Sequence, residues 1–165
     1  MATPTVSRFA LVAIWVVVLA LATALLFPML VNEGPRRSAC LARIKECALG
    51  EVLYAEQNNE RFPPSNSWMD VTRPFVRDDE VFACPDVRKT DPKGYGYAMS
   101  VSLGSAKQAW VRNPEKAALI FDSILLNRNA CSDVYGLPNP PRYSGNSVAY
   151  ADGHARRMRA RETKP

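Results

Sequence analysis

The pattern of apolar and polar positions opens with a long apolar run. No charged side chain occurs from Phe9 to Val31. At about 1.5 Å per residue, a helix of this length reaches ~34 Å, which exceeds the roughly 30 Å hydrocarbon core of a bilayer. The run therefore predicts a transmembrane helix over 9–31, behind a short tail over 1–8. A cleaved secretory signal is the alternative, because Ala20-Leu21-Ala22 offers a small-residue cleavage site, but the run is longer than a signal core needs.

A second pattern follows the break Asn32-Glu33-Gly34-Pro35. From about Arg37 to Asn58, apolar residues recur every three or four positions, as on a helix with one buried face. This spacing predicts an amphipathic helix. Its expected buried stripe is Leu41, Ile44, Ala48, Val52 and Ala55, with Cys40 and Cys47 at the edge of that stripe.

The rest of the chain predicts short strands joined by irregular loops. Lys116–Phe121 has the composition of a buried strand, and Val81–Pro85 that of a short edge strand ending at its proline. Asp152-Gly153 lies between two strand-like arms, 147–151 and 154–158, which predicts a hairpin with a two-residue type I′ turn.

The predicted fold class is α+β. A single N-terminal transmembrane helix precedes the amphipathic helix, which packs on a small antiparallel sheet with long, disulfide-stapled loops. The length behind the apolar run suits one domain with one core, placed over 36–158. A basic tail over 159–165 follows.

Basic residues give the chain a formal net charge of +5. They gather in two places, just behind the apolar run and towards the C-terminus: Arg36, Arg37, Arg43 and Lys45, then Arg156, Arg157, Arg159, Arg161 and Lys164. A solvated, frayed terminus explains the second group better than an anionic partner does. No nucleic-acid partner is predicted, because no binding motif accompanies the charge.

The four cysteines, an even number, favour disulfides formed in an oxidising compartment. Cys40 and Cys47 lie about 10 Å apart along one predicted helix, too far to pair with each other. Two connectivities stay open: 40–84 with 47–131, or 40–131 with 47–84. A zinc site is disfavoured, because the chain has no Cys-x-x-Cys and a single histidine, His154.

The chain carries no recognised catalytic motif. Asp122 and Asp152 are the one carboxylate pair to consider, but a strand end and a turn explain them better. His154 has no Asp, Glu or Cys at ligand or triad spacing and is expected to face solvent. Phosphate loops, nucleophile elbows and dense oxygen-ligand runs for calcium are absent from the sequence. The sequence thus predicts a non-enzyme without catalytic, cofactor or metal sites and without a small-molecule substrate.

The apolar run carries a surface suited to helix packing. Trp15 falls in its middle, where an indole N–H is served best by a neighbouring helix. Ala20, Ala22 and Ala24 with Thr23 are small enough to admit a close approach. Trp15, Ala20, Thr23 and Ala24 are therefore predicted to pack against other membrane protein subunits within the lipid bilayer.

The order of these parts resembles that of type IV pilins and type II secretion pseudopilins. More narrowly, the chain is similar to the pseudopilin-like, prepilin-type processing-associated group named for a C-terminal His-x9-Asp-Gly motif. Five segments carry the likeness: Ala24–Pro28, Cys40–Glu46 through Tyr54–Glu56, Arg61–Pro63, Val81–Pro85 and Tyr150–His154.

The chain departs from that family at three positions. Arg8 stands where processed pilins have their cleavage-site glycine, and Ala13 where they carry a docking glutamate. Arg142 stands at the spacing of the signature histidine from Asp152, and Tyr143 is its equivalent if one residue was lost. These departures favour a permanently anchored domain over a working filament subunit.

The resemblance implies a location, a cysteine pairing and a function. It places the C-terminal domain on the periplasmic side of a bacterial inner membrane, against the basic flank behind the apolar run, which by itself indicates the cytoplasm. Because Cys40 and Cys84 occupy family positions, it selects disulfides 40–84 and 47–131. The expected function is a non-enzymatic accessory subunit that docks onto a larger membrane protein complex, for example a respiratory or photosynthetic one. The alternative is a minor pseudopilin of a secretion or pilus machine.

Overall fold

The computed structural model describes residues 8–31, 34–133, 136–143 and 145–159, and within these ranges the side chains of 11–24, 27 and 39–158. The chain divides into two compact units, Met1–Pro35 and Arg36–Pro165. The predicted N-terminal tail, apart from Arg8, and residues 160–165 of the predicted basic tail lie outside the described residues.

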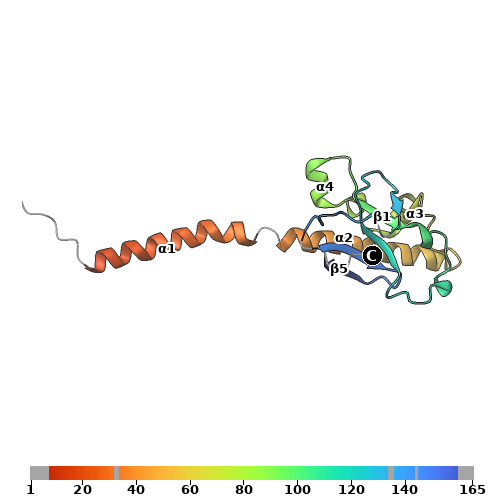
Figure 1. Ribbon diagram of the computed structural model, residues 1–165, viewed down its shortest axis with the longest axis horizontal. Coiled ribbons are helices and arrows are strands. Elements are labelled where there is room, and N and C mark those ends of the chain that lie inside the picture. Colours follow the sequence, from red (N-terminus) through yellow and green to blue (C-terminus); the bar gives the residue numbers. More distant parts are fainter. Residues whose placement is uncertain (1–7, 32–33, 134–135, 144, 160–165) are drawn as a thin grey trace, which may run out of the picture. The chain divides into compact units, whose positions relative to one another are not determined.

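The first unit contains helix α1, Arg8–Val31, which has the predicted bounds to within one residue (Figure 1). The prediction that this helix spans a membrane is wrong. A span needs about 20 consecutive, predominantly apolar residues, and no helix in the described part of the chain is long and apolar enough to meet that requirement.

Helix α2, Gly34–Gln57, belongs to the second unit from Arg36 on, and it starts three residues before its predicted beginning. Pro35 sits in its first turn, where the missing N–H of proline costs no hydrogen bond. The helix ends at Gln57, and the following residues Asn59 and Glu60 have left-handed φ angles of 57° and 58°, which turn the chain away from the helical path. Asn58 closes the last turn, its Nδ2 donating to the Tyr54 carbonyl at 2.8 Å.

The buried face of α2 is rotated from the predicted stripe. Leu41 and Val52 are only partly buried, whereas both cysteines are central to the face. Its fully buried side chains are Cys40, Ile44, Cys47, Ala48, Glu51 and Ala55.

Five strands form one sheet in the order β3-β1-β2-β4-β5. Their bounds are Tyr97–Ser100 (β1), Ala118–Asp122 (β2), Cys131–Ser132 (β3), Gly145–Tyr150 (β4) and Ala155–Arg159 (β5). The prediction of an antiparallel sheet is wrong at one edge, because β3 runs parallel to β1. The loop after β2 carries the chain back across β1 to the edge of the sheet. There β3 runs in the same direction as β1, with Cys131 opposite Met99.

Six short helices of the described chain lie outside the sheet, four of them between α2 and β1 and two between β1 and β2. They are α3 (Trp68–Thr72), α4 (Pro85–Thr90) and four 3₁₀ helices, η1 (Arg73–Phe75), η2 (Asp79–Phe82), η3 (Val101–Leu103) and η4 (Gln108–Trp110). The strand predicted over Val81–Pro85 is therefore wrong. Asp78 caps η2 by accepting from the Glu80 N–H, and Pro85 opens α4.

Alternation along the strands divides the core between the two faces of the sheet. Tyr97 and Met99 join the larger cluster, which includes the buried face of α2, whereas Ala98 joins a smaller one with Phe121 and Val148. Successive side chains of a strand point to opposite faces, so β1 contributes to both clusters.

The predicted hairpin is present, but its turn is different. The Tyr150 N–H donates to the His154 carbonyl, and the Gly153 N–H donates to the Tyr150 carbonyl, both at 2.9 Å. Of the three loop residues Ala151, Asp152 and Gly153, only Gly153 has a positive φ, at 84°. A type I′ turn needs two positive φ angles, so this is a three-residue loop that ends on a left-handed glycine.

The predicted basic tail begins later than its charges suggest. Arg156 and Arg157 are paired residues of β5, opposite Val148 and Ser147. The Arg156 Nε donates to the Tyr150 hydroxyl at 2.8 Å, and the Arg157 guanidinium lies 5.5 Å from the Tyr143 ring. These two arginines therefore belong to the folded domain.

Candidate functional site

A pair of buried thiols joins α2 to the loop that precedes α4. The Sγ atoms of Cys40 and Cys84 lie 3.0 Å apart, and neither residue is exposed to solvent. The Tyr97 hydroxyl closes the site from β1, donating to the Cys40 carbonyl at 3.5 Å. The thiol pair thus lies where α2, the sheet and the α4 loop meet.

Three successive contacts along α2 hold the segment Val81–Cys84. After Cys40, the Arg43 Nη1 donates to the Ala83 carbonyl at 2.7 Å, and the Cys47 thiol donates to the Val81 carbonyl at 3.5 Å. Positions three and four apart share one helix face, so this spacing lets α2 follow the segment in the opposite chain direction.

The two thiols have different acid strengths because they share one hydrogen bond. That bond lowers the pKa of Cys84, and backbone N–H groups of Val87 and Asp86 at the start of α4 add to the effect. The same bond raises the pKa of Cys40, and burial raises it further. Either sulfur atom can donate this hydrogen bond, so the two thiols act as one site.

All four cysteines are free thiols in this structure, which corrects the prediction of disulfide-stapled loops. A disulfide requires sulfurs about 2.05 Å apart. The structure brings the predicted pair Cys40 and Cys84 together, with their sulfur atoms 3.0 Å apart, but both thiols are reduced. Cys47 points to Val81, while Cys131 lies half-buried on the edge strand β3, and within the described residues no contact joins them.

Asp122 and Asp152 do not form a carboxylate pair, because each has a different partner. Asp122 is buried at the end of β2, where its Oδ2 accepts from the Ser147 N–H at 2.6 Å and its Oδ1 lies 3.6 Å from Arg142 Nη1. Burial raises the pKa of Asp122, while the Ser147 N–H and Arg142 oppose that rise. Arg142 also donates to the carbonyls of Gly96 and Ser123, and so connects its loop to the sheet.

His154 does have an acidic partner, contrary to the sequence prediction. Its Nδ1 lies 2.5 Å from Asp152 Oδ1, and its ring stacks on Tyr150 with centroids 4.4 Å apart. Asp152 lies only two positions before His154, a spacing that is typical of neither a catalytic triad nor a metal site. The tight hairpin loop nevertheless brings the two side chains together. The pair fixes the hairpin end, at the loop that Asp152 and Gly153 were predicted to form.

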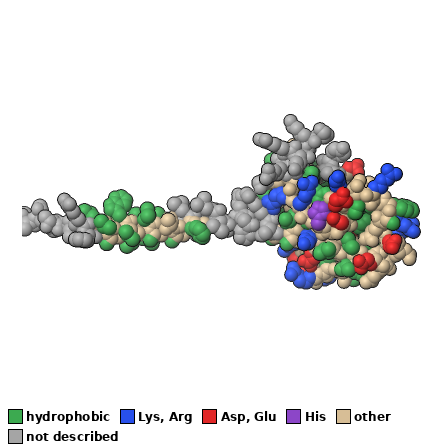
Figure 2. All heavy atoms as spheres, turned by 90° about the horizontal axis from the view of Figure 1, so that it is seen from below, with side chains coloured by type: hydrophobic (Ala, Val, Ile, Leu, Met, Phe, Trp, Pro, Cys, Tyr) green, Lys and Arg blue, Asp and Glu red, His purple; other side chains and the backbone are tan. Residues whose placement is uncertain are grey.

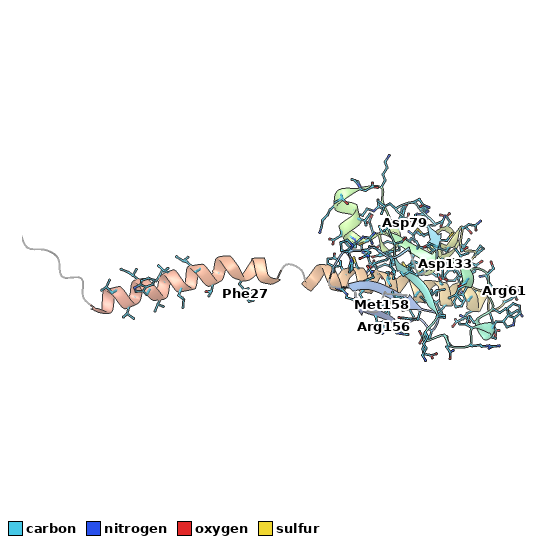
Figure 3. All side chains as sticks on the ribbon, in the orientation of Figure 1. Phe27, Arg61, Asp79, Asp133, Arg156 and Met158 are labelled. Atoms are coloured by element: carbon cyan, nitrogen blue, oxygen red, sulfur yellow. The ribbon has the colours of Figure 1, made fainter. Side chains whose placement is uncertain are left out.

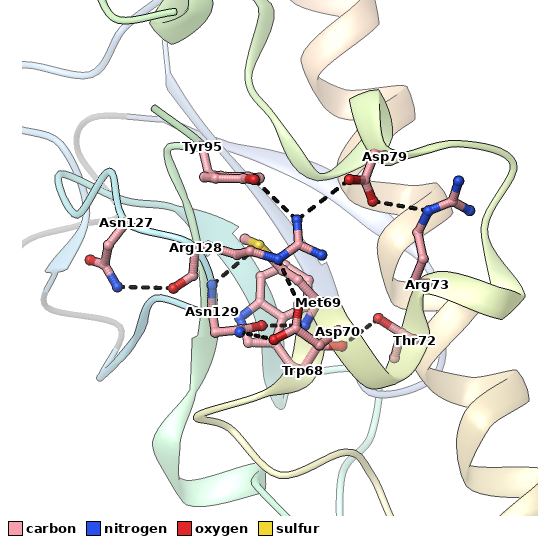
Figure 4. A network of polar contacts seen from close by, with 10 residues as sticks. All are labelled: Trp68, Met69, Asp70, Thr72, Arg73, Asp79, Tyr95, Asn127, Arg128 and Asn129. Atoms are coloured by element: carbon pink, nitrogen blue, oxygen red, sulfur yellow. Dashed lines mark hydrogen bonds and ion pairs between the residues drawn. The ribbon is translucent and has the colours of Figure 1, made fainter. Parts of the chain in front are cut away.

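A second polar cluster lies around Arg128 (Figure 4). The Arg128 Nε donates to Asp70 Oδ1 at 2.6 Å, and its Nη1 donates to the Tyr95 hydroxyl at 3.0 Å and lies 3.6 Å from Asp79 Oδ2. The hydrogen bond from Arg128 lowers the pKa of Asp70. These contacts tie α3 and η2 to the loop before β3, so the cluster stabilises the fold.

Glu51 is the residue that sequence reasoning missed. It lies on the buried face of α2, and neither of its carboxyl oxygens has a hydrogen-bond partner within the described residues. Burial raises the pKa of Glu51 well above its usual range. Its spacing from Cys47 and Ala55, four residues each way, was the available signal, because it places Glu51 on their face.

Helix α1 presents apolar side chains to solvent in every direction. The large ones are between 48% and 71% exposed: Leu11, Val12, Ile14, Trp15, Val16, Val17, Val18, Leu19, Leu21 and Phe27 (Figures 2 and 3). Of the predicted packing residues, Trp15 is 71% exposed, and Ala20, Thr23 and Ala24 are also exposed. The Thr23 hydroxyl donates to the carbonyls of Leu19 and Ala20, so it needs no partner from another chain.

Within the described residues no group of three His, Cys, Asp or Glu side chains is placed to hold a metal ion. Two open hollows, of about 380 and 440 Å³, combine apolar surface with charged side chains, which are Asp86, Lys89 and Arg142 in one and Glu115, Lys116 and Arg156 in the other. Neither lining contains a cysteine or histidine. The chemistry that the described site supports is thiol oxidation at Cys40 and Cys84.

No protein-family model, curated protein or solved structure matches the chain. The likeness to pseudopilins, with the location and the function that it implies, therefore stays a prediction.

Proposed function

We propose that the chain is a non-enzymatic accessory subunit that docks onto a larger protein complex through helix α1. The observation that carries the proposal is the exposure of ten large apolar side chains on this one helix. Fully burying such a side chain is worth roughly 1.5–3 kcal/mol. A helix that is apolar on all sides is a buried helix, so its free energy is lowered most when other protein elements cover it.

One side of α1 is suited to a neighbouring helix. Ala20, Thr23 and Ala24 follow the spacing of one helical face, and small side chains let two backbones approach closely. Trp15 adds a large apolar surface and an N–H donor to the same helix. A membrane protein complex is the partner class that the sequence predicts.

The test is gentle extraction from native material, native gel separation and mass spectrometry of the band that contains the chain. We expect migration at fixed stoichiometry with a large complex. The double variant Ala20→Leu/Ala24→Leu fills the small face and is expected to abolish this migration.

The matched control is Val18→Leu/Ala22→Leu, which has the same spacing on the opposite side of the helix, about 200° from Ala20 and Ala24. It is expected to keep the complex. Migration of the native chain alone, or with secretion components only, contradicts the proposal.

A further inference from the structure

An exposed tryptophan in the second unit lies between two cations. Trp110 is 68% exposed, the Arg61 guanidinium lies 5.6 Å from its ring centroid, and the Lys107 ammonium lies 5.9 Å from it. Figure 3 labels Arg61 at the periphery of this domain. We name these three residues the Trp110 platform.

Among the residues that the structure describes, no carboxylate pairs with either cation of the platform. The ion pairs of the described chain use other cations, such as Arg43, Arg73 and Arg128, and none includes Arg61 or Lys107. Cation–π contacts at exposed sites are worth only about 0.5–1 kcal/mol. The platform therefore keeps two positive charges that a carboxylate can still approach.

Two loops hold the platform rigidly. The Gln108 N–H donates to the Glu60 carbonyl at 2.8 Å, the Phe62 N–H to the Ala106 carbonyl at 3.0 Å, and Arg61 Nη1 to the Ser105 carbonyl at 2.9 Å. Three of the four non-glycine residues with positive φ in the described chain lie here: Asn59, Glu60 and Ser105. Such strained residues persist where surrounding contacts fix the backbone, so little ordering remains to be done on binding.

We propose that the Trp110 platform binds an acidic, partly apolar segment of a protein partner. Carboxylates of that segment pair with Arg61 and Lys107, and its aliphatic side chains cover the indole. Tryptophan and arginine are enriched among the residues that dominate binding energy at protein interfaces. The inference goes beyond the proposed function, because it concerns the second unit and requires no contact with α1.

The test is a titration of the full-length chain with a short peptide that alternates glutamate and leucine, and binding is measured by isothermal titration calorimetry. A peptide with lysine in place of each glutamate is the matched probe. We expect binding of the acidic peptide only, weaker at high salt because exposed charges are screened. Trp110→Ala and Arg61→Ala/Lys107→Ala are each expected to weaken binding about tenfold or more.

The control variant is Lys45→Ala/Lys93→Ala, which removes two exposed cations elsewhere and is expected to leave binding unchanged. The variant Arg61→Ala/Lys107→Ala keeps the test valid if Trp110→Ala fails to fold. Absence of acidic-peptide binding, equal weakening by the control variant, or binding of anionic phosphatidylglycerol vesicles in place of the peptide overturns the proposal. None of these results bears on the complex formed through α1, which the native gel tests separately.

Discussion

A carboxyl group without a partner lies in the middle of the main core. Glu51 is fully buried on α2, one turn after Cys47, and burial raises the pKa of the Cys47 thiol as well. Burial alone accounts for the raised pKa of Glu51. The folded chain therefore favours the neutral form of this glutamate.

The pH dependence follows from the raised pKa. A group whose folded pKa exceeds its unfolded value, about 4.3 for glutamate, contributes its full stability below that unfolded value. The contribution is lost as pH rises through the folded pKa. We expect Glu51→Gln to reduce the fall in the free energy of unfolding that begins above the unfolded pKa of about 4.3, measured by urea unfolding.

Glu51→Met is the companion variant, and it removes the buried polar group itself. It is expected to raise the free energy of unfolding near neutral pH by about 1–3 kcal/mol, the usual cost of a buried group without a hydrogen bond. Glu56→Gln, at an exposed position of the same helix, is the control and should change little. A less stable Glu51→Met variant would show that the carboxyl group makes a favourable contact.

At the scale of single residues, the sequence identified the right cysteines but not their setting. The predicted approach of Cys40 to Cys84 came from a family resemblance, and the structure places their sulfurs 3.0 Å apart. Glu51, Arg142 and Arg128 became notable only in three dimensions. Their partners lie on other elements, and spacing along the chain carries no information about such contacts.

At the scale of elements, the contact between α2 and the segment Val81–Cys84 decides how the α4 loop is held. Cys40, Arg43 and Cys47 contact this segment in turn. A covalent link between Cys40 and Cys84, 44 positions apart, would restrict the unfolded chain far more than the folded one.

Mild oxidation with oxidised glutathione is expected to form this link. One thiolate of the pair attacks glutathione disulfide, which forms a mixed disulfide and releases one glutathione. The other thiolate then attacks the protein sulfur of that mixed disulfide and releases the second glutathione. The chain should lose two hydrogen atoms by intact mass. Its free energy of unfolding should rise by about 4 kcal/mol, the loop-entropy value for this separation.

Cys40→Ser and Cys84→Ser should each abolish the gain, whereas Cys131→Ser should retain it. A mapped link from Cys47 to Cys131 in place of this one would contradict the expectation.

The prediction of elements was accurate where the local signal was strong. The long helices and the arms of the final hairpin are present, and the strand predicted over Lys116–Phe121 is found at Ala118–Asp122. Val81–Pro85 was misjudged, because the cap at Asp78 and the proline that opens α4 outweigh the apolar residues between them. The turn at Asp152 was misjudged because one left-handed glycine, not two left-handed residues, closes the loop.

At the scale of the whole molecule, the chain consists of an apolar helical unit and a domain with its own core. Every hydrogen bond given above for the core and the sheet lies within Arg36–Pro165. We therefore expect a fragment that starts at Gly34, the first residue of α2, to fold without α1. Its free energy of unfolding in urea should match that of the full chain to within about 1 kcal/mol, since distant, independent parts contribute additively.

Far-ultraviolet circular dichroism checks that the fragment keeps its helix and sheet. A fragment that unfolds without cooperativity would show that α1 contributes to the stability of the domain.

The sequence by itself determined the α+β class, the two long helices and the hairpin arms, because periodicity and turn residues act over short distances. It misjudged what depends on distant contacts. The parallel pairing of β3 with β1 and the inward position of Glu51 required the tertiary structure. The platform of Arg61, Lys107 and Trp110 also formed only when two loops, distant in sequence, were joined by hydrogen bonds. Burial and charge at such sites are set by residues from several elements at once, which no local pattern specifies.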